Sequence, residues 1–180
     1  VASGIADWAQ HESKISPWRY SAHLSVLYEQ AGDIDHAIDL GERAIVQNPN
    51  VGALYVDVAW KYLLHERNLP RAKELLEQAG RLELIEMAKP FLLRNHGIVA
   101  LREGRFADAE KLLLEAFGIF QAHTKMHFRH SSMMLTKGFL AQAEAKLGKT
   151  QQARKHFAEA KEWLEAAKMG PILKACAALA

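Results

Sequence analysis

The sequence predicts an all-α fold made of repeated antiparallel helical hairpins. Apolar residues recur at the spacing of one helix face, and the same residue types return at the same relative positions four times. The five prolines stand far apart, at places that separate the expected helices. A chain of 180 residues in which 49% are hydrophobic is long enough to bury a core.

Each of the four units has a first and a second helix that carry small residues at fixed places. The first helices carry Ser25, Ala59, Gly97 and Ala141. The second helices carry alanine pairs seven residues apart, at Ala37 and Ala44, Ala72 and Ala79, Ala109 and Ala116, and Ala153 and Ala160. Small side chains let paired helices approach closely. Three units also place a glycine between the helices, which favours a left-handed turn conformation.

The expected helices follow from this pattern. They cover residues 18–31, 34–47, 51–66, 70–81, 85–102, 106–121, 125–147 and 150–168. Ser16 and Pro17 are the expected N-cap and first helical position of the first of them. A helix near 4–12 would close an earlier unit, so the chain is expected to be a piece of a longer protein. Gly170 and Pro171 end the last long helix, and 172–179 forms a short apolar helix.

This pattern resembles the tetratricopeptide repeat (TPR), and the unit 18–51 matches best, with the family's length of 34 residues. The second unit has no turn glycine, the third has Ala100 where the family prefers an aromatic, and the fourth has Lys137 and Glu144 at apolar places. The resemblance implies a right-handed superhelix, or α-solenoid. The expected single domain, 1–180, comprises a partial repeat (1–17), repeats at 18–51, 52–86, 87–121 and 122–168, and a capping or truncated helix (169–180).

The resemblance also implies a function, because such solenoids present a concave groove lined by their first helices. The expected role is a protein-interaction module or scaffold that holds a partner protein or peptide segment. The expected partner-binding residues are Val26, Glu29, Val56, Trp60, Leu63, Arg94, Ile98 and Arg102. Further first-helix positions on that side are Phe91, Gly138, Gln142 and Ala145. The alternative for Trp60 and Phe91 is packing between neighbouring helices.

Self-association is the leading alternative. The apolar ends 1–8 and 172–179 would pair with a second copy and close the solenoid as a homodimer. Binding of RNA is less favoured, because the equivalent first-helix positions do not repeat a polar readout residue. The charge of the chain also argues against nucleic-acid binding, because the net charge is only +2. The charge is unevenly distributed, since residues 1–68 hold five Lys or Arg against nine Asp or Glu. No nucleic acid is therefore expected as a partner.

A histidine cluster lies in the long connection between the third and fourth units. His123, His127 and His130 would share one face if the preceding helix included His123, and three imidazoles at that spacing are weak candidates for a metal site. A basic contact to an acidic partner and a solvated helix end are the other interpretations. No cofactor is expected.

The remaining features exclude several classes. No nucleophile, base and orienting group converge in the pattern, so an enzyme is not expected. No apolar run reaches 18 residues, so no membrane insertion is expected. Cys176 is the only cysteine, which excludes an internal disulfide and favours a small core residue in a cytoplasmic protein.

Overall fold

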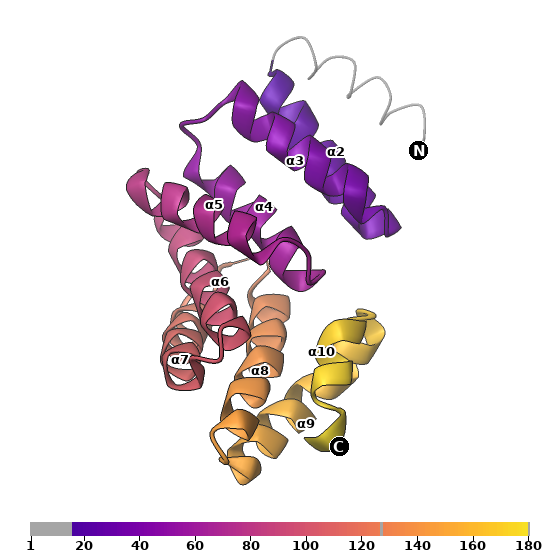
Figure 1. The fold of residues 1–180 in the computed structure, drawn as a ribbon, viewed down its shortest axis with the longest axis vertical. Helices are drawn as coiled ribbons and strands as arrows, with labels where there is room; N and C mark the ends of the chain where they lie inside the picture. The colour runs from indigo at the N-terminus through magenta and orange to yellow at the C-terminus, as the bar shows by residue number, and fades with distance from the viewer. Residues whose placement is uncertain (1–15, 127, 180) are drawn as a thin grey trace. The chain divides into compact units, whose positions relative to one another are not determined.

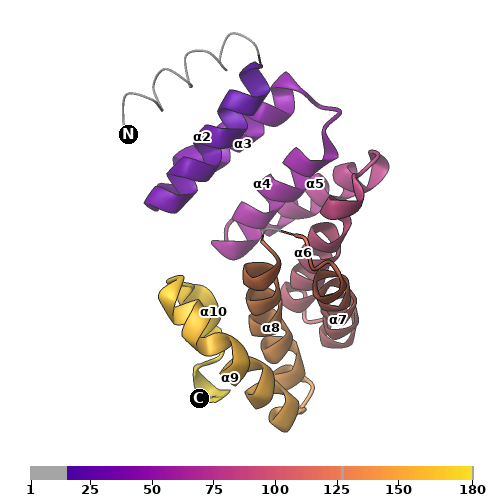
Figure 2. The same cartoon turned by 180° about the vertical axis from the view of Figure 1, so that it is seen from behind.

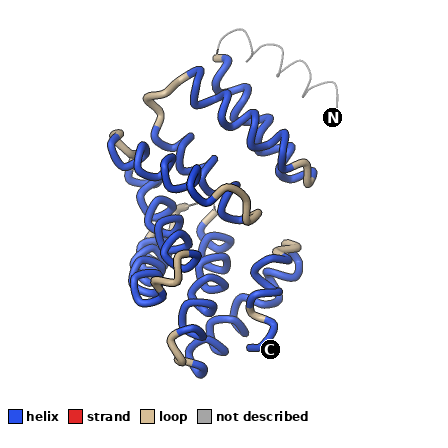
Figure 3. Tube along the Cα trace, in the orientation of Figure 1, coloured by secondary structure: helices blue, strands red, loops and turns tan. Residues whose placement is uncertain are grey.

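The computed structural model describes residues 16–126 and 128–179, and within them it contains helices and loops but no strand (Figure 3). Figure 1 labels the α-helices. They are α2 (Pro17–Ala31), α3 (Ile34–Gln47), α4 (Gly52–Leu64), α5 (Leu69–Arg81), α6 (Lys89–Arg102), α7 (Phe106–Ala122), α8 (Arg129–Lys146), α9 (Thr150–Ala166) and α10 (Gly170–Ala175). Two 3₁₀ turns cover Glu86–Ala88 and Ala177–Leu179. The all-α prediction is confirmed.

The chain divides into two compact units, Val1–Ile85 and Glu86–Ala180, and the division falls between the second and third expected repeats. In the first unit α2 pairs with α3, α4 pairs with α5, and α3 packs against α4. In the second unit α6 pairs with α7, α8 pairs with α9, and α7 packs against α8. Figures 1 and 2 show these pairs from opposite sides. That 1–180 forms one continuous domain stays a prediction.

The small residues that define the repeat lie where the helices of a hairpin meet. The eight alanines that form the seven-residue pairs of the second helices are completely buried, as are Ser25, Ala59 and Ala141 of the first helices. Gly41 shows why size matters here. A Cβ added to it would stand 2.6 Å from Cγ2 of Val58, so α3 and α4 approach more closely than an alanine permits. The spacing seen in the sequence is therefore the spacing of helix contacts.

One backbone hydrogen bond ends the first helix of every hairpin. The N–H of Asp33 donates to the carbonyl of Tyr28 at 2.9 Å, and the same bond recurs from Arg67 to Tyr62, from Arg105 to Ala100 and from Lys149 to Glu144. This is the six-to-one bond of a Schellman turn, which places one residue in the left-handed region. Gly32, Gly104 and Gly148 supply that residue in three hairpins. In the second hairpin Glu66 takes it, with φ 53°.

Two helices begin four residues later than expected. The α6 helix begins at Lys89 instead of residue 85, with Pro90 in its first turn, where a missing N–H costs nothing. The α8 helix begins at Arg129, because residues 123–126 form the turn that follows α7. Ser16 is the N-cap of α2, as expected, although its side chain accepts no capping hydrogen bond. The helix expected at 4–12 lies outside the described residues.

Candidate interaction surface

The eight predicted partner-binding residues separate into buried and accessible groups. The buried side chains are Val56, Leu63, Arg94 and Ile98, and the partly accessible ones are Val26, Glu29, Trp60 and Arg102. A buried side chain cannot meet a partner unless the fold rearranges. The accessible part of the predicted surface in the first unit therefore consists of Val26 and Glu29 on α2 and Trp60 on α4.

Arg94 belongs to the interior in this structure. Its side chain is buried, its guanidinium lies 5.3 Å from the ring centre of Phe91, and Nη2 donates to Asn95 Oδ1 at 3.5 Å. Burial lowers the pKa of the Arg94 guanidinium. Phe91 in turn packs edge-on against Phe120 with ring centres 5.0 Å apart. Phe91 therefore packs against the buried cluster of Ala116, Phe120 and Met126, and its own side chain is partly buried.

Glu29 holds α2 to α4 through a network of charged side chains. The ammonium of Lys61, which is completely buried, lies 2.5 Å from Asp57 Oδ2 and 3.5 Å from Glu29 Oε2. His65 Nε2 lies 3.6 Å from the other oxygen of Glu29. Burial alone would raise the pKa of Glu29, but the neighbouring His65 and Lys61 side chains outweigh it and lower that pKa. Glu29 is therefore ionised, and both its oxygens are already engaged.

Exposed apolar side chains stand beside Glu29 on α2. Val26, Leu27 and Tyr28 are each more than a third exposed, with Val26 at 37%. Tyr28 stacks on His36 of α3 with ring centres 5.3 Å apart, whereas Val26 occupies a position that the resemblance assigns to the groove. Sequence reasoning identified Val26 but missed Leu27. Two adjacent helix positions face different directions, so a stripe pattern does not indicate that both are exposed.

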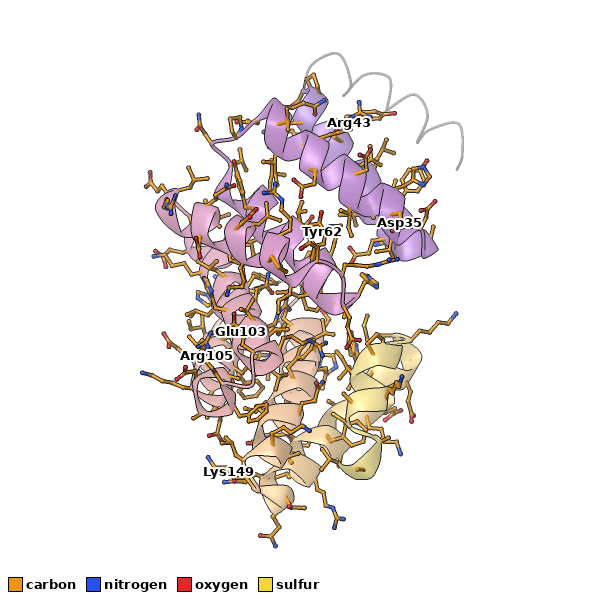
Figure 4. The ribbon with its side chains drawn as sticks, viewed as in Figure 1. Asp35, Arg43, Tyr62, Glu103, Arg105 and Lys149 are labelled. Carbon is orange, nitrogen blue, oxygen red and sulfur yellow. The ribbon has the colours of Figure 1, made fainter. Side chains whose placement is uncertain are left out.

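A shallow cavity of about 310 Å³ opens on the first unit between α3 and the end of α4. Its lining residues are Asp35, Ile38, Asp39, Glu42, Tyr62 and Arg67. Arg67 forms an ion pair with Asp35 at 3.3 Å, and the Arg71 guanidinium donates two hydrogen bonds to the Glu42 carboxylate, at 2.9 and 2.7 Å. Figure 4 labels Asp35 and Tyr62 on the two neighbouring helices. The spacing of Asp35, Asp39 and Glu42 along α3 could have indicated this acidic face.

The metal hypothesis requires that the helix before the connection include His123, and α7 ends one residue earlier, at Ala122. His123 follows the last residue of α7 with a non-helical ψ of 74°, and His130 lies in the first turn of α8. His127 lies outside the described residues. Arg129 instead binds the end of α7, where it donates to the carbonyls of Phe120 and Gln121 at 3.1 and 2.9 Å. Within the described ranges, no group of three His, Cys, Asp or Glu side chains could hold a metal ion.

Comparison with known proteins identifies the architecture. No protein-family model and no curated protein matches the sequence. A solved structure does match. It is a chain named as a kinesin light chain of Podosopora anserina with nearly identical TPR-like repeats, and the match has 18% identity and a TM-score of 0.55. It covers 89% of this chain and 83% of that one. The fold is that of a TPR-like helical repeat.

The polar departures of the fourth TPR-like hairpin have partners inside that hairpin. Glu144 stands on α8 at the place where the repeat prefers an aromatic, and it is buried. Its Oε2 is hydrogen-bonded to Nδ1 of His156 on α9 at 2.8 Å. Lys137 on α8 pairs with Glu159 on α9 at 2.5 Å and lies over the ring of Phe117 on α7. Lys137 and Glu144 are therefore each matched by a polar residue on the second helix of this hairpin.

The end of the last TPR-like hairpin is covered by α10. Ile172 and Cys176 are buried, and within the described residues no large apolar side chain of this segment is exposed. Burial raises the pKa of the Cys176 thiol to about 11, so at neutral pH it is an unreactive thiol and not a nucleophile. Self-association through exposed apolar residues of 172–179 therefore loses its support. The other predicted end, 1–8, lies outside the described residues.

Proposed function

We propose that the chain is a protein-interaction module whose partner segment docks on the first-helix face of the first unit. TPR-like repeats serve in general as scaffolds for protein interaction, because stacked hairpins present extended surfaces without a catalytic pocket. Within the described residues, no helix is both long and apolar enough to cross a membrane. A cytoplasmic location stays a prediction from the single cysteine.

The observation that carries the proposal is the combination of Val26, Glu29 and Trp60. An exposed aliphatic residue and a partly accessible tryptophan lie on α2 and α4, and the ion pair of Glu29 with Lys61 joins these two helices. Tryptophan is among the residues that contribute most to binding at protein interfaces. The burial of Val56, Leu63, Arg94 and Ile98 reduces the predicted surface to these residues, with Arg102 as a separate accessible position on the second unit.

The test is affinity capture from the source lysate, followed by titration of the identified partner by calorimetry. Val26→Asp and Trp60→Ala should each weaken binding at least tenfold, since truncation of a central interface anchor costs about 2 kcal/mol or more. Val46→Asp is the matched control: Val46 is 80% exposed, but it lies on the second helix α3. Circular dichroism must show unchanged helicity in all three variants.

Two results would contradict the proposal. One is a partner that binds the Val26→Asp and Trp60→Ala variants as tightly as the original chain. The other is equal loss of affinity in the Val46→Asp control, which would place the interface on the second helices or indicate a general effect of added charge.

A further inference from the structure

The helix α10 lies on a face that the TPR resemblance assigns to partners. Gly138 of α8 is one of the first-helix positions of the expected groove. A Cβ on Gly138 would stand 2.6 Å from Cγ2 of Ile172, so α10 rests directly on the α8 backbone. The thiol of Cys176 donates to the carbonyl of the same Gly138 at 3.5 Å. The chain's own helix therefore covers this part of the face.

Few contacts hold α10 in place. In the segment 170–179 only Ile172 and Cys176 are buried, while Pro171, Lys174 and Ala175 are exposed. A helix of six residues is far shorter than the ~12–15 residues that an isolated helix needs in water. Two buried side chains, with the partly buried Leu173 and Leu179, must therefore offset the conformational entropy of ordering the whole segment. By contrast, α9 buries Ala153, Phe157, Ala160 and Leu164.

The turn that leads into α10 is strained. Lys168 adopts φ 56°, in the left-handed region that side chains other than glycine's rarely occupy. The turn is fixed by the N–H of Met169, which donates to the carbonyl of Leu164 at 2.9 Å. This is the same six-to-one bond that ends the first helix of each hairpin, so the turn marks where α9 stops and α10 begins.

Opening would uncover an apolar slot of defined shape. Its floor is the bare backbone of Gly138, and its wall is Leu164 of α9, whose Cδ1 lies 3.2 Å from the same added Cβ. Both residues are buried while α10 is docked. The slot fits a branched aliphatic side chain presented by a short helix, as Ile172 shows.

We propose that α10 is an exchangeable occupant of this slot, and that a short apolar helix of a partner protein displaces it. The partner helix carries a branched aliphatic residue at the place of Ile172. This proposal rests on the proposed function, because it names the kind of partner segment that the second unit binds. Its evidence lies on α8, α9 and α10 alone, so it is tested separately from Val26 and Trp60.

Cys176 provides the probe, because it is the only cysteine of the full chain and it is buried directly after α10, with its thiol on the carbonyl of Gly138. The rate of its reaction with an aromatic disulfide reagent is measured with a synthetic peptide added in trans. The peptide has the sequence of residues 170–178 with Cys176→Ser. Displacement predicts a labelling rate that rises at least threefold and then saturates with millimolar peptide. The same peptide with Ile172→Asp should have no effect.

Two matched glycine variants test the slot itself. Gly138→Ala forces Ile172 outward and should raise the labelling rate several-fold without the peptide. Gly118→Ala, on α7, should leave the rate unchanged, because no atom lies within 4 Å of the added Cβ. Urea titrations of both variants separate opening of α10 from global unfolding, since local opening exposes little surface and depends weakly on denaturant.

The proposal is overturned if Cys176 reacts only through global unfolding and the peptide leaves its rate unchanged. It is also overturned if Gly138→Ala behaves like Gly118→Ala. A labelling rate that rises with protein concentration would indicate that the displacing helix is α10 of a second copy and not a helix of a partner protein. Loss of capture by Val26→Asp together with an unresponsive Cys176 would leave the proposed function standing and refute this inference alone.

Discussion

The substitution Gly41→Ala tests whether close helix approach stabilises the first unit. Gly41 lies in the middle of α3 and is buried. Its added Cβ would meet Val58 Cγ2 at 2.6 Å and Ser25 Oγ at 3.4 Å. Val58 cannot turn away easily, because a β-branched side chain in a helix has one strongly preferred rotamer. Ser25 is also fixed, since its hydroxyl donates to the Ala37 carbonyl at 2.6 Å.

The expected magnitude follows from two opposing effects. Alanine gains about 0.4–1 kcal/mol over glycine through the lower entropy of the unfolded chain. Overpacking of a filled contact costs about 1–3 kcal/mol. We therefore expect a net loss of about 1–2 kcal/mol. The control is Gly80→Ala on α5 of the same unit, where no atom lies within 4 Å of the added Cβ. It should gain up to about 1 kcal/mol.

The stability of both variants is measured by thermal unfolding, with circular dichroism at 222 nm as the readout. Both substitutions lie in the first unit, so their effects are compared in the same transition. A difference of about 2 kcal/mol between them corresponds to a difference of about 4–8 °C in Tm for a chain of this size. Gly41→Ala should lie below the original chain and Gly80→Ala at or above it. If the two variants are equally stable, the Gly41 contact does not limit helix approach and the packing argument fails.

Two further predictions concern the second unit. His156→Ala should lower the free energy of unfolding by about 1–3 kcal/mol in urea titrations, because the buried carboxylate of Glu144 loses its partner. The double variant Glu144→Leu with His156→Leu should recover most of that loss, and failure to recover would mean that the hydrogen bond is not the cause. The pKa of Cys176 is about 11 in the folded chain, above the ordinary thiol value of about 8.5. Its contribution to stability is therefore complete below about pH 8.5 and falls as the pH rises towards 11. Cys176→Ala should reduce the loss of stability between pH 8 and pH 10.5, and an unchanged loss would contradict the assigned burial.

Much of the fold could be predicted from the sequence because its determinants are local. Helical spacing, small residues at fixed places and turn glycines depend on residues close together in the chain. Gly32, Gly104 and Gly148 all adopt the predicted left-handed conformation. The second hairpin makes the same turn without glycine, and Glu66 takes the strained position. There the common hydrogen bond of the turn, together with packing of the hairpin, prevails over the preference of one residue.

The candidate surface could be predicted only in part, because accessibility depends on contacts between helices. The repeat pattern assigned Val26 and Ile98 to equivalent positions, yet Val26 is exposed and Ile98 is completely buried. Arg94 was expected to contact a partner, but it lies inside against Phe91. A repeat pattern gives the direction of a side chain on its own helix. It does not give what stands in front of that side chain.

The sequence by itself determined the helices, their pairing into TPR-like hairpins and the small residues that let them pack. Only the tertiary structure decided which groove positions are accessible, how Glu144 and Lys137 are matched on α9, and that α10 rests on Gly138. The physical reason is distance along the chain. Helix propensity and turns act over a few residues. Burial and hydrogen bonds between α8, α9 and α10 join residues 12 to 38 positions apart, as in Glu144 with His156 and Gly138 with Cys176.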